Sequence, residues 1–374
     1  MDNYVMSWAE IDLRAIRSNI AAIKKLIAPE VRWMAIVKAN AYGHGVLEAA
    51  RVCLEEGASY LGVACPKEAM TLRQNDINAQ VLVLGYMPSN CAELMIENRI
   101  DVTVFDLDTA LALSKAAIAV GKEARVHLKI DTGMGRLGFK PEAASLEIIR
   151  EIAHLPGIRV EGLFSHLATA DHADKSYARQ QAALFKNFGD NLEAAGISIP
   201  LKHLANSAAI MEMPEAHFDM VRAGIITYGL YPSDEVDRSI LELKPAMTLK
   251  SKVSFVKTLP AGHSVSYGRT YISQQETRVA TVPIGYADGY NRRLSNHGWA
   301  VIKGQKVPLI GVVCMDQCMF DVSGLEDVKA GDEVILFGKP EDGVTADDLA
   351  DIIGTINYEI VCSPSSRIAR TYID

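Results

Sequence analysis

The sequence lacks any apolar run of the roughly 20 residues that a membrane-spanning helix needs. Residues 1–14 also lack the basic segment and apolar core that mark a secretory signal peptide. Only six cysteines occur among 374 residues, and they lie scattered among apolar neighbours rather than at the spacings of a disulfide framework. From these absences we expect a cytoplasmic protein that does not bind membranes.

Signals for metal and nucleic-acid binding are equally scarce. Cys314 and Cys318 have no second Cys/His pair at zinc-binding spacing, so we expect no metal site. A formal net charge of −8 argues against a broad surface for nucleic acid. A basic pocket for one phosphate group remains compatible with this charge, because local charge and net charge are separate quantities.

An alternation of strand and helix patterns is present between residues 32 and 230. Eight short apolar, β-branched runs occupy residues 33–38, 60–64, 81–86, 102–105, 126–130, 160–166, 203–205 and 220–222. Amphipathic helical patterns separate most of them, which predicts parallel strands with right-handed crossovers. Eight strands within roughly 200 residues fit a (β/α)8 barrel of the TIM type. An open doubly wound sheet would satisfy the same alternation.

The pattern changes after Pro232 to short strand-like runs separated by Gly, Pro and Asp turns. These runs occupy residues 252–259, 278–284, 300–302, 306–314, 319–322 and 333–337. We therefore expect a barrel over residues 12–233 and a mainly β domain over residues 234–374. Residues 7–10 are strand-like before a helix that begins near Leu13, so we expect residues 1–11 to join the β domain. One late helix is expected over residues 345–353, with Thr345 as its N-cap.

Polar residues occur at the carboxyl ends of the expected barrel strands, where barrel enzymes carry their chemistry. They are Lys38 after the first strand, Lys129 and Asp131 after the fifth, Ser165 and His166 after the sixth, Asn206 and Ser207 after the seventh, and Arg222 in the eighth. Each alone has a structural explanation, such as a solvent-facing strand end for Lys38. Their position at one shared end of the barrel predicts a convergent polar pocket.

The loops after the seventh and eighth strands are rich in small residues. They read Asn206-Ser207-Ala208 and Ala223-Gly224-Ile225. Barrels often bind a phosphate group with the backbone N–H groups of these two loops. A lysine across the barrel mouth from such a site predicts a phosphorylated aldehyde cofactor held by Lys38 as a Schiff base.

A glycine-rich segment offers a different interpretation. Residues 133–138 match the dinucleotide fingerprint G-x-G-x-x-G and follow an expected strand. The segment follows the fifth strand rather than the first, however, and no ribose-binding acid ends a following strand at the expected spacing. We favour a glycine-rich loop that presents Arg136 to the pocket.

Seven segments together resemble the alanine racemases, a fold-type-III pyridoxal-phosphate family. They are residues 37–45 (VKANAYGHG), 129–139 (KIDTGMGRLGF), 165–171, 265–268, 283–290, 314–317 and 356–359. The resemblance covers nearly the whole chain. Two departures occur, since Ala223 stands where the family commonly has proline and residues 363–370 match only loosely.

The resemblance implies how pyridoxal 5'-phosphate is bound. Lys38 would form the aldimine, and the other cofactor-binding residues would be Tyr42, Arg136, His166, Asn206, Ser207, Arg222, Gly224, Ile225 and Tyr358. It also implies a head-to-tail homodimer in which Tyr267 and Met315 of the partner subunit enter the active site. Met315 and Arg136 would contact the substrate, alanine.

The resemblance further implies interconversion of L- and D-alanine by two bases, which would supply D-alanine for peptidoglycan. Lys38 would act on the D-face and Tyr267 of the partner subunit on the L-face. We expect His166 to hydrogen-bond Tyr267, and Arg222 to hold His166 and donate to the pyridine nitrogen. Lys129 and Arg136 are both cations, and carbamylation of Lys129 would convert the repulsion between them into attraction.

Three other functions compete with racemisation. An amino-acid decarboxylase of the same architecture would carry a carboxylate at the pyridine nitrogen instead of Arg222. A non-catalytic pyridoxal-phosphate carrier would resemble a lone barrel without Tyr267 and its β domain. A nicotinamide oxidoreductase would use the glycine-rich segment.

Overall fold

The computed structural model describes residues 5–374, which form two compact units. One unit contains Arg17–Ala41 and Val46–Leu243, and the other contains the residues through Ile16, Tyr42–Gly45 and Lys244–Asp374. Residues 1–4, part of the segment expected to join the β domain, lie outside the described residues.

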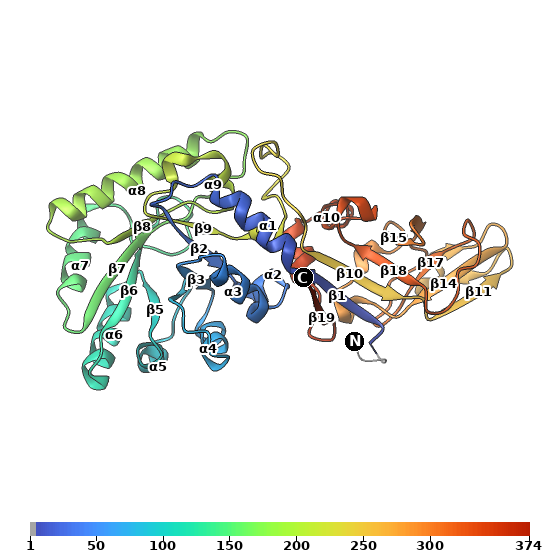
Figure 1. Cartoon of the computed structure of the whole chain (residues 1–374), viewed down its shortest axis with the longest axis horizontal. Helices are drawn as coiled ribbons and strands as arrows, with labels where there is room; N and C mark the ends of the chain where they lie inside the picture. The colour runs from blue at the N-terminus through green and yellow to red at the C-terminus, as the bar shows by residue number, and fades with distance from the viewer. Residues whose placement is uncertain (1–4) are drawn as a thin grey trace. The chain divides into compact units, whose positions relative to one another are not determined.

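The first unit contains an eight-stranded sheet in the order β8-β7-β6-β5-β4-β3-β2-β9 (Figure 1). Its strands are β2 Arg32–Ile36, β3 Tyr60–Val63, β4 Val81–Val83, β5 Ile100–Val104, β6 Ala124–Lys129, β7 Ile158–Phe164, β8 Leu201–His203 and β9 Met220–Ala223. The ladders between neighbours in this order are parallel. Hydrogen bonds from Asp219 N to Lys202 O (3.0 Å) and from Arg222 N to Ala205 O (3.0 Å) join the β8 and β9 ends. The predicted (β/α)8 barrel is confirmed, and the alternative of an open doubly wound sheet is excluded.

Helices lie on the outside of this barrel, as Figure 1 shows for α6, α7 and α8. They are α1 Leu13–Lys24, α3 Val46–Glu55, α4 Pro66–Gln74, α5 Ala92–Glu97, α6 Leu107–Val120, α7 Ala143–Ala153, α8 Ser176–Ala194 and α9 Ser207–Glu212. Local sequence fixes their starts: Asp106 caps α6 by accepting from Thr109 N, and Pro66 occupies the first turn of α4. No helix among residues 5–374 is long and apolar enough to cross a membrane.

Side chains alternate across each barrel strand, and this alternation sorts apolar from polar residues. On β6, Val126 and Leu128 are fully buried on one face, while Arg125, His127 and Lys129 share the other. Contacts of this second group with side chains from β5, β7 and β8 place it inside the barrel. Polar groups therefore occupy much of an interior that branched aliphatic residues usually fill.

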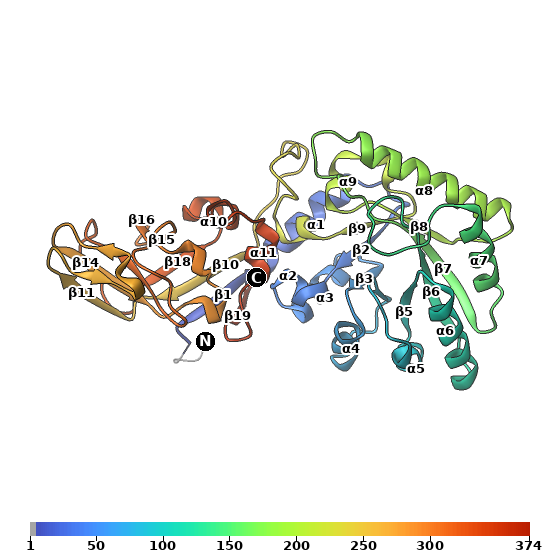
Figure 2. The same ribbon diagram turned by 180° about the vertical axis from the view of Figure 1, so that it is seen from behind.

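The second unit is mainly β, as predicted. A six-stranded sheet has the order β16-β15-β18-β10-β1-β19 (Figure 2). Its strands are β16 Gln305–Pro308, β15 Trp299–Ile302, β18 Glu333–Phe337, β10 Met247–Lys252, β1 Ser7–Asp12 and β19 Ala369–Ile373. A smaller sheet contains β11 Phe255–Leu259, β14 Thr277–Val282 and β17 Cys318–Asp321, and β12 Ser264–Val265 pairs with β13 Tyr271–Ile272.

The predicted bounds of two strands in this unit were wrong. The run 252–259 is divided between two sheets, because Val253 N bonds to Asp332 O and Ser254 N to Thr281 O at the break. The run 306–314 ends as strand β16 at Pro308, and Gly311 then adopts a left-handed φ of 77° that a strand does not accommodate.

Both chain ends of the described protein pair within the larger sheet. Strand β1 runs antiparallel to β10 and parallel to β19. The late helix α10, Ala346–Ile353, begins as predicted, since the Thr345 hydroxyl accepts from Asp348 N at 3.1 Å. A short helix α11, Asn357–Cys362, follows it.

Candidate active site

Lys38 is half-buried and follows β2 after one intervening residue. The next four residues, Ala39 to Tyr42, all have left-handed backbone angles with φ between 52° and 55°. These residues form the short segment α2 Lys38–Tyr42. Left-handed geometry costs roughly 1–2 kcal/mol for each residue that carries a Cβ, so surrounding contacts must hold this turn.

Hydrogen bonds from neighbouring groups hold the left-handed turn. Ala41 N donates to Val37 O at 2.9 Å, and Val46 N donates to the Asn40 side-chain oxygen at 2.9 Å. Glu68, in the first turn of α4, accepts from Ala39 N and from Ala64 N, both at 2.7 Å. The carboxylate of Glu68 therefore ties the loop after β3 to the backbone next to Lys38.

The glycine-rich segment after β6 is a folded-back loop and not the start of a helix. Asp131 Oδ1 accepts from the N–H groups of Gly133 (2.9 Å) and Gly135 (3.0 Å). Burial alone would raise the pKa of Asp131, but these hydrogen bonds lower it below its usual value. The N–H groups that a dinucleotide phosphate would need thus face a carboxylate, which excludes that interpretation. Arg136 on the same loop is exposed.

Lys129, at the end of β6, is buried with only 4% of its surface exposed. Its Nζ lies 3.2 Å from Ile130 O and 4.9 Å from the centre of the Phe164 ring. Burial, followed by the charges of Arg222 and Arg136, lowers the pKa of Lys129 well below its usual value. A larger fraction of this amine is therefore uncharged near neutral pH than in an ordinary lysine.

Arg222 is buried inside the barrel, and the four protons of its two Nη groups face five acceptors. Nη1 reaches His203 O (2.8 Å) and His203 Nδ1 (3.2 Å), and Nη2 reaches Ser165 O (2.9 Å), Leu204 O (2.9 Å) and His166 Nδ1 (3.2 Å). Burial, with the nearby charge of Arg136, lowers the pKa of Arg222 to about 9, so the guanidinium is protonated at neutral pH. Within the described chain, Nε has no hydrogen bond, and the side chain makes no ion pair with a carboxylate.

His166 lies beside Arg222 and is neutral. Burial lowers the pKa of His166 well below its usual value, and the charges of Arg222, Lys129, Arg136 and Lys38 lower it further. A guanidinium can only donate, so Nδ1 of His166 must accept and the ring proton lies on Nε2. This tautomer leaves His166 with a donor for a second partner.

The two small-residue loops meet at the ends of β8 and β9. Ser207 is buried at the start of α9, and its hydroxyl accepts from Gly224 N at 3.0 Å. Asn206 caps α9 by accepting from Ala209 N at 3.1 Å, and Ile225 begins the next short helical turn. The structure thus brings Ser207, Gly224 and Ile225 into one cluster, with Asn206 at its edge.

Four predicted site residues belong to the other unit. Tyr42 and Tyr358 lie close together there, with ring centroids 6.0 Å apart. Tyr267 and Met315 are exposed to 71% and 52%, high values for large apolar side chains. Burial raises the pKa of Tyr42 above its usual value.

Family comparisons agree with this geometry. The family model "Alanine racemase, N-terminal domain" matches residues 11–232, and "Alanine racemase, C-terminal domain" matches residues 246–372. The chain belongs to the alanine racemase family. An alanine racemase from Clostridium perfringens strain SM101 is 53% identical over 367 residues, which covers 98% of this chain and 95% of the relative. One from Methanococcus maripaludis is 47% identical and covers 98% of each chain.

Solved alanine racemase structures also match. One from Clostridium difficile 630 has a TM-score of 0.96 at 45% identity, covering 99% of this chain and 96% of that one. A Bacillus anthracis structure described with bound L-Ala-P has a TM-score of 0.95 at 37% identity, covering 100% of this chain and 96% of that one. These matches agree with the barrel and the mainly β domain of the alanine racemase fold.

Three site features were missed from sequence. Glu68 looks like an ordinary first-turn acid of a helix, and nothing local signals its two backbone partners. The left-handed turn contains alanines, which give no hint of positive φ. His127 and His203, by contrast, had a signal: polar residues alternate with apolar ones along β6 as Arg125-Val126-His127-Leu128-Lys129, which indicates side chains inside the barrel.

Proposed function

We propose that this protein interconverts L- and D-alanine with pyridoxal 5'-phosphate. When bound, this cofactor supplies an electron-withdrawing system that makes the α-proton of an attached amino acid acidic. The observation that carries the proposal is the buried, protonated Arg222, which has an unbonded Nε donor inside the barrel and lies beside a neutral His166.

The residues present fit this cofactor. Lys38 would hold it covalently. The Ser207 hydroxyl and the backbone N–H groups of Gly224 and Ile225 would bind the phosphate, which would replace the Ser207 oxygen as the acceptor of Gly224 N. Asn206, Tyr42 and Tyr358 would complete the phosphate site, and the exposed Arg136 would bind the cofactor phenolate and the substrate carboxylate. Nε of Arg222 would donate to the pyridine nitrogen.

Arg222 favours racemisation over competing reactions. A guanidinium keeps its proton, so it would leave the pyridine nitrogen unprotonated. A carboxylate at this place would favour a protonated ring and stronger electron withdrawal, which suits decarboxylation and transamination. Weaker electron withdrawal by the cofactor ring suits a racemase, which must return a proton to the α-carbon promptly.

Two bases on opposite faces would move the α-proton. We propose Lys38 for the D-face and Tyr267 of the partner subunit for the L-face. A phenol needs help to act as a base near neutral pH. The Nε2–H of His166 would donate to the Tyr267 oxygen and stabilise its deprotonated form, and the contact of Arg222 with Nδ1 supports this tautomer.

We also propose that Lys129 is carbamylated. Its neutral Nζ would attack the carbon of carbon dioxide, forming a C–N bond while one C–O electron pair moves to oxygen and Nζ releases a proton to water. The product is an anion that could orient Arg136. The burial of Lys129 and its lowered pKa support this step, because only the uncharged amine is nucleophilic.

The remaining assignments follow from family membership. We propose a head-to-tail homodimer with Tyr267 and Met315 of the partner subunit in each active site, which the exposure of these side chains supports. We place the domain boundary between residues 233 and 234. A cytoplasmic location and supply of D-alanine for peptidoglycan stay predictions.

One assay tests the proposed function. Purified protein loaded with pyridoxal 5'-phosphate and given L-alanine should form D-alanine until both enantiomers are equal, without nicotinamide and without release of carbon dioxide. Borohydride reduction and peptide mapping should place the cofactor on Lys38. Absence of D-alanine, release of carbon dioxide or a label on another lysine would contradict the proposal.

A further inference from the structure

A row of buried polar side chains continues from Arg222 into the barrel interior. Nη1 of Arg222 lies 3.2 Å from His203 Nδ1, and His203 Nε2 lies 3.0 Å from His127 Nδ1. His127 Nε2 in turn lies 3.5 Å from Asp101 Oδ2, an electrostatic contact whose geometry is not that of a hydrogen bond. These four side chains come from β9, β8, β6 and β5, and each is at least 96% buried. None of the three beyond Arg222 takes part in the proposed chemistry.

The two hydrogen bonds of this row, from Arg222 to His203 and from His203 to His127, run in one direction when both rings are neutral. Arg222 has no acceptor, so His203 Nδ1 must accept and the proton of a neutral His203 lies on Nε2. His203 then donates to His127 Nδ1, which places the His127 proton on Nε2, facing Asp101. A carboxylate accepts and does not donate, so the far end of the row agrees with the direction that Arg222 imposes.

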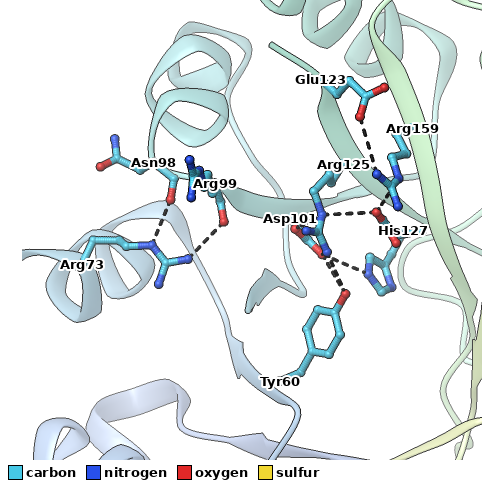
Figure 3. A network of polar contacts seen from close by, with 10 residues as sticks. Tyr60, Arg73, Asn98, Arg99, Asp101, Glu123, Arg125, His127 and Arg159 are labelled. Carbon is cyan, nitrogen blue, oxygen red and sulfur yellow. Dashed lines mark hydrogen bonds and ion pairs between the residues drawn. The ribbon is translucent and has the colours of Figure 1, made fainter. Parts of the chain in front are cut away.

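Asp101 is the negative end of the row. Figure 3 shows Tyr60, Arg125 and His127 converging on its carboxylate. Arg125 Nε lies 3.1 Å from Oδ1, and the Tyr60 hydroxyl donates to Oδ2 at 3.1 Å. Arg125 also pairs with Glu161 at 3.3 Å. Two carboxylates thus surround Arg125, whereas among residues 5–374 Arg222 reaches an anion only through the two imidazoles.

The surroundings leave room for the imidazoles and fix their planes. A Cβ on Gly162 would lie 2.4 Å from His127 Nδ1, so only glycine leaves space for that ring. Phe164 stacks on His203 with ring centroids 4.8 Å apart and an angle of 4°, and Tyr60 meets the His127 ring edge-on. Burial, followed by the charge of Arg222, lowers the pKa of His203 well below its usual value, which agrees with a neutral ring.

We propose that Asp101, His127 and His203 are positioning residues for Arg222: two one-way hydrogen bonds, from Arg222 to His203 and from His203 to His127, end at the negative charge of Asp101 and form a relay that polarises His203 Nδ1 as an acceptor and thereby fixes the guanidinium. The inference rests on the proposed function, in which Arg222 donates to the cofactor. Polarisation along hydrogen-bonded chains strengthens each link inside a low-dielectric interior. Arg222 has no carboxylate partner among the described residues. The relay would instead fix the orientation in which its Nε donates to the pyridine nitrogen of the cofactor.

The first test measures tautomers and does not depend on catalysis. In the holoenzyme labelled with nitrogen-15 histidine, long-range proton–nitrogen spectra report which ring nitrogen carries the proton; the His203→Gln and His127→Gln variants assign the signals. Both rings should be neutral with the proton on Nε2 near pH 7.5. A proton on Nδ1 of either ring, or a charged ring, would overturn the relay.

The second test asks whether distant members act as one unit. Asp101→Asn and His203→Gln should each lower kcat/KM about tenfold, mainly through kcat, as is typical when a supporting hydrogen bond is lost. If both act through the relay, the double variant should lose no more than the worse single variant. A loss of about a hundredfold in the double variant, or no loss in either single one, would contradict the relay.

Thr103→Val is the matched control. Thr103 is also fully buried on β5, but its hydroxyl bonds only to Val83 O and lies outside the relay. This variant should keep wild-type kcat/KM and wild-type tautomers. If the wild-type protein fails to racemise alanine, the proposed function is wrong, and the tautomer measurement still tests the relay. If the protein racemises alanine but the histidines have the opposite tautomers, only the relay is wrong.

Discussion

At the residue scale, the proposed reaction depends most on Arg222. Its guanidinium has five acceptors around it, three of them main-chain carbonyls, and one donor left for a ligand. The surroundings are therefore built for a cation. A carboxylate at this position would face carbonyl oxygens and would also change the protonation of the cofactor ring.

Replacing Arg222 by glutamate should redirect the chemistry. We expect racemisation to fall at least about a hundredfold, in the range seen when a preorganised charge is removed, and transamination to become detectable. D-alanine and pyruvate formed from L-alanine measure the two reactions. Arg222→Lys is the control, because it keeps the positive charge and should give less pyruvate. Equal pyruvate from both variants would contradict the role assigned to Arg222.

Lys129 can be tested by chemical rescue. Lys129→Ala should remove the proposed carbamate and release Arg136, raising KM for alanine about tenfold, as loss of one charge-assisted contact does. Acetate should restore part of the loss by supplying a carboxylate in the vacated space. Acetate should not activate the wild-type enzyme. Failure of short carboxylates to rescue the variant would count against carbamylation.

At the element scale, the left-handed turn after Lys38 shows why neighbouring residues matter more than propensity. Ala39, Asn40 and Ala41 adopt positive φ because Glu68, Val37 and Asn40 supply hydrogen bonds that fix the backbone. The turn begins right after the residue proposed to hold the cofactor. Its strain is consistent with a functional constraint on that backbone.

Ala39→Gly should therefore stabilise the protein. Glycine adopts positive φ without the Cβ penalty, so we expect the free energy of unfolding to rise by about 1 kcal/mol. Ala119 is the matched control, since it is exposed on the right-handed helix α6. Ala119→Gly should instead lower the free energy by about 0.5–1 kcal/mol. Urea denaturation of both variants measures the difference; destabilisation by Ala39→Gly would show that the turn is not strained.

The elements themselves were mostly predictable from the sequence. All eight barrel strands were expected, because buried parallel strands read as short apolar runs between helical patterns. Seven expected runs cover most of the observed strand, but the run 203–205 shares only His203 with β8 Leu201–His203. The polar residues at their carboxyl ends followed from the geometry of a barrel. The break at Val253 and Ser254 was missed because two strands of different sheets form one continuous strand-like pattern in the sequence. The Glu68 contacts and the His203–His127 row depend on which strands are neighbours, which local patterns do not encode.

At the scale of the whole molecule, buried neutral histidines should make stability depend on pH. Burial lowers the pKa values of His166 and His203 in the folded protein, so below about pH 6.5 the unfolded chain binds more protons than the folded one. Stability should therefore fall as the pH decreases through 6.5. Each such histidine should contribute a loss of about 1.4 kcal/mol at pH 5.5.

His203→Gln tests this dependence. The fall in the free energy of unfolding between pH 7.5 and pH 5.5 should be smaller in the variant by about 1.4 kcal/mol, whatever its absolute stability. His154 is exposed on the surface and provides the control substitution His154→Gln. An unchanged pH dependence in His203→Gln would mean that His203 is not held neutral by the fold.

The central claim is that each active site combines Lys38 of one subunit with Tyr267 of the partner subunit, and mixing two inactive variants tests it most directly. Lys38→Ala and Tyr267→Phe should each lack racemase activity as homodimers. After unfolding and refolding together, half of the dimers should be mixed and each should contain one intact site, restoring about one quarter of wild-type D-alanine formation. Continued inactivity of a mixture shown to contain mixed dimers would contradict the shared site.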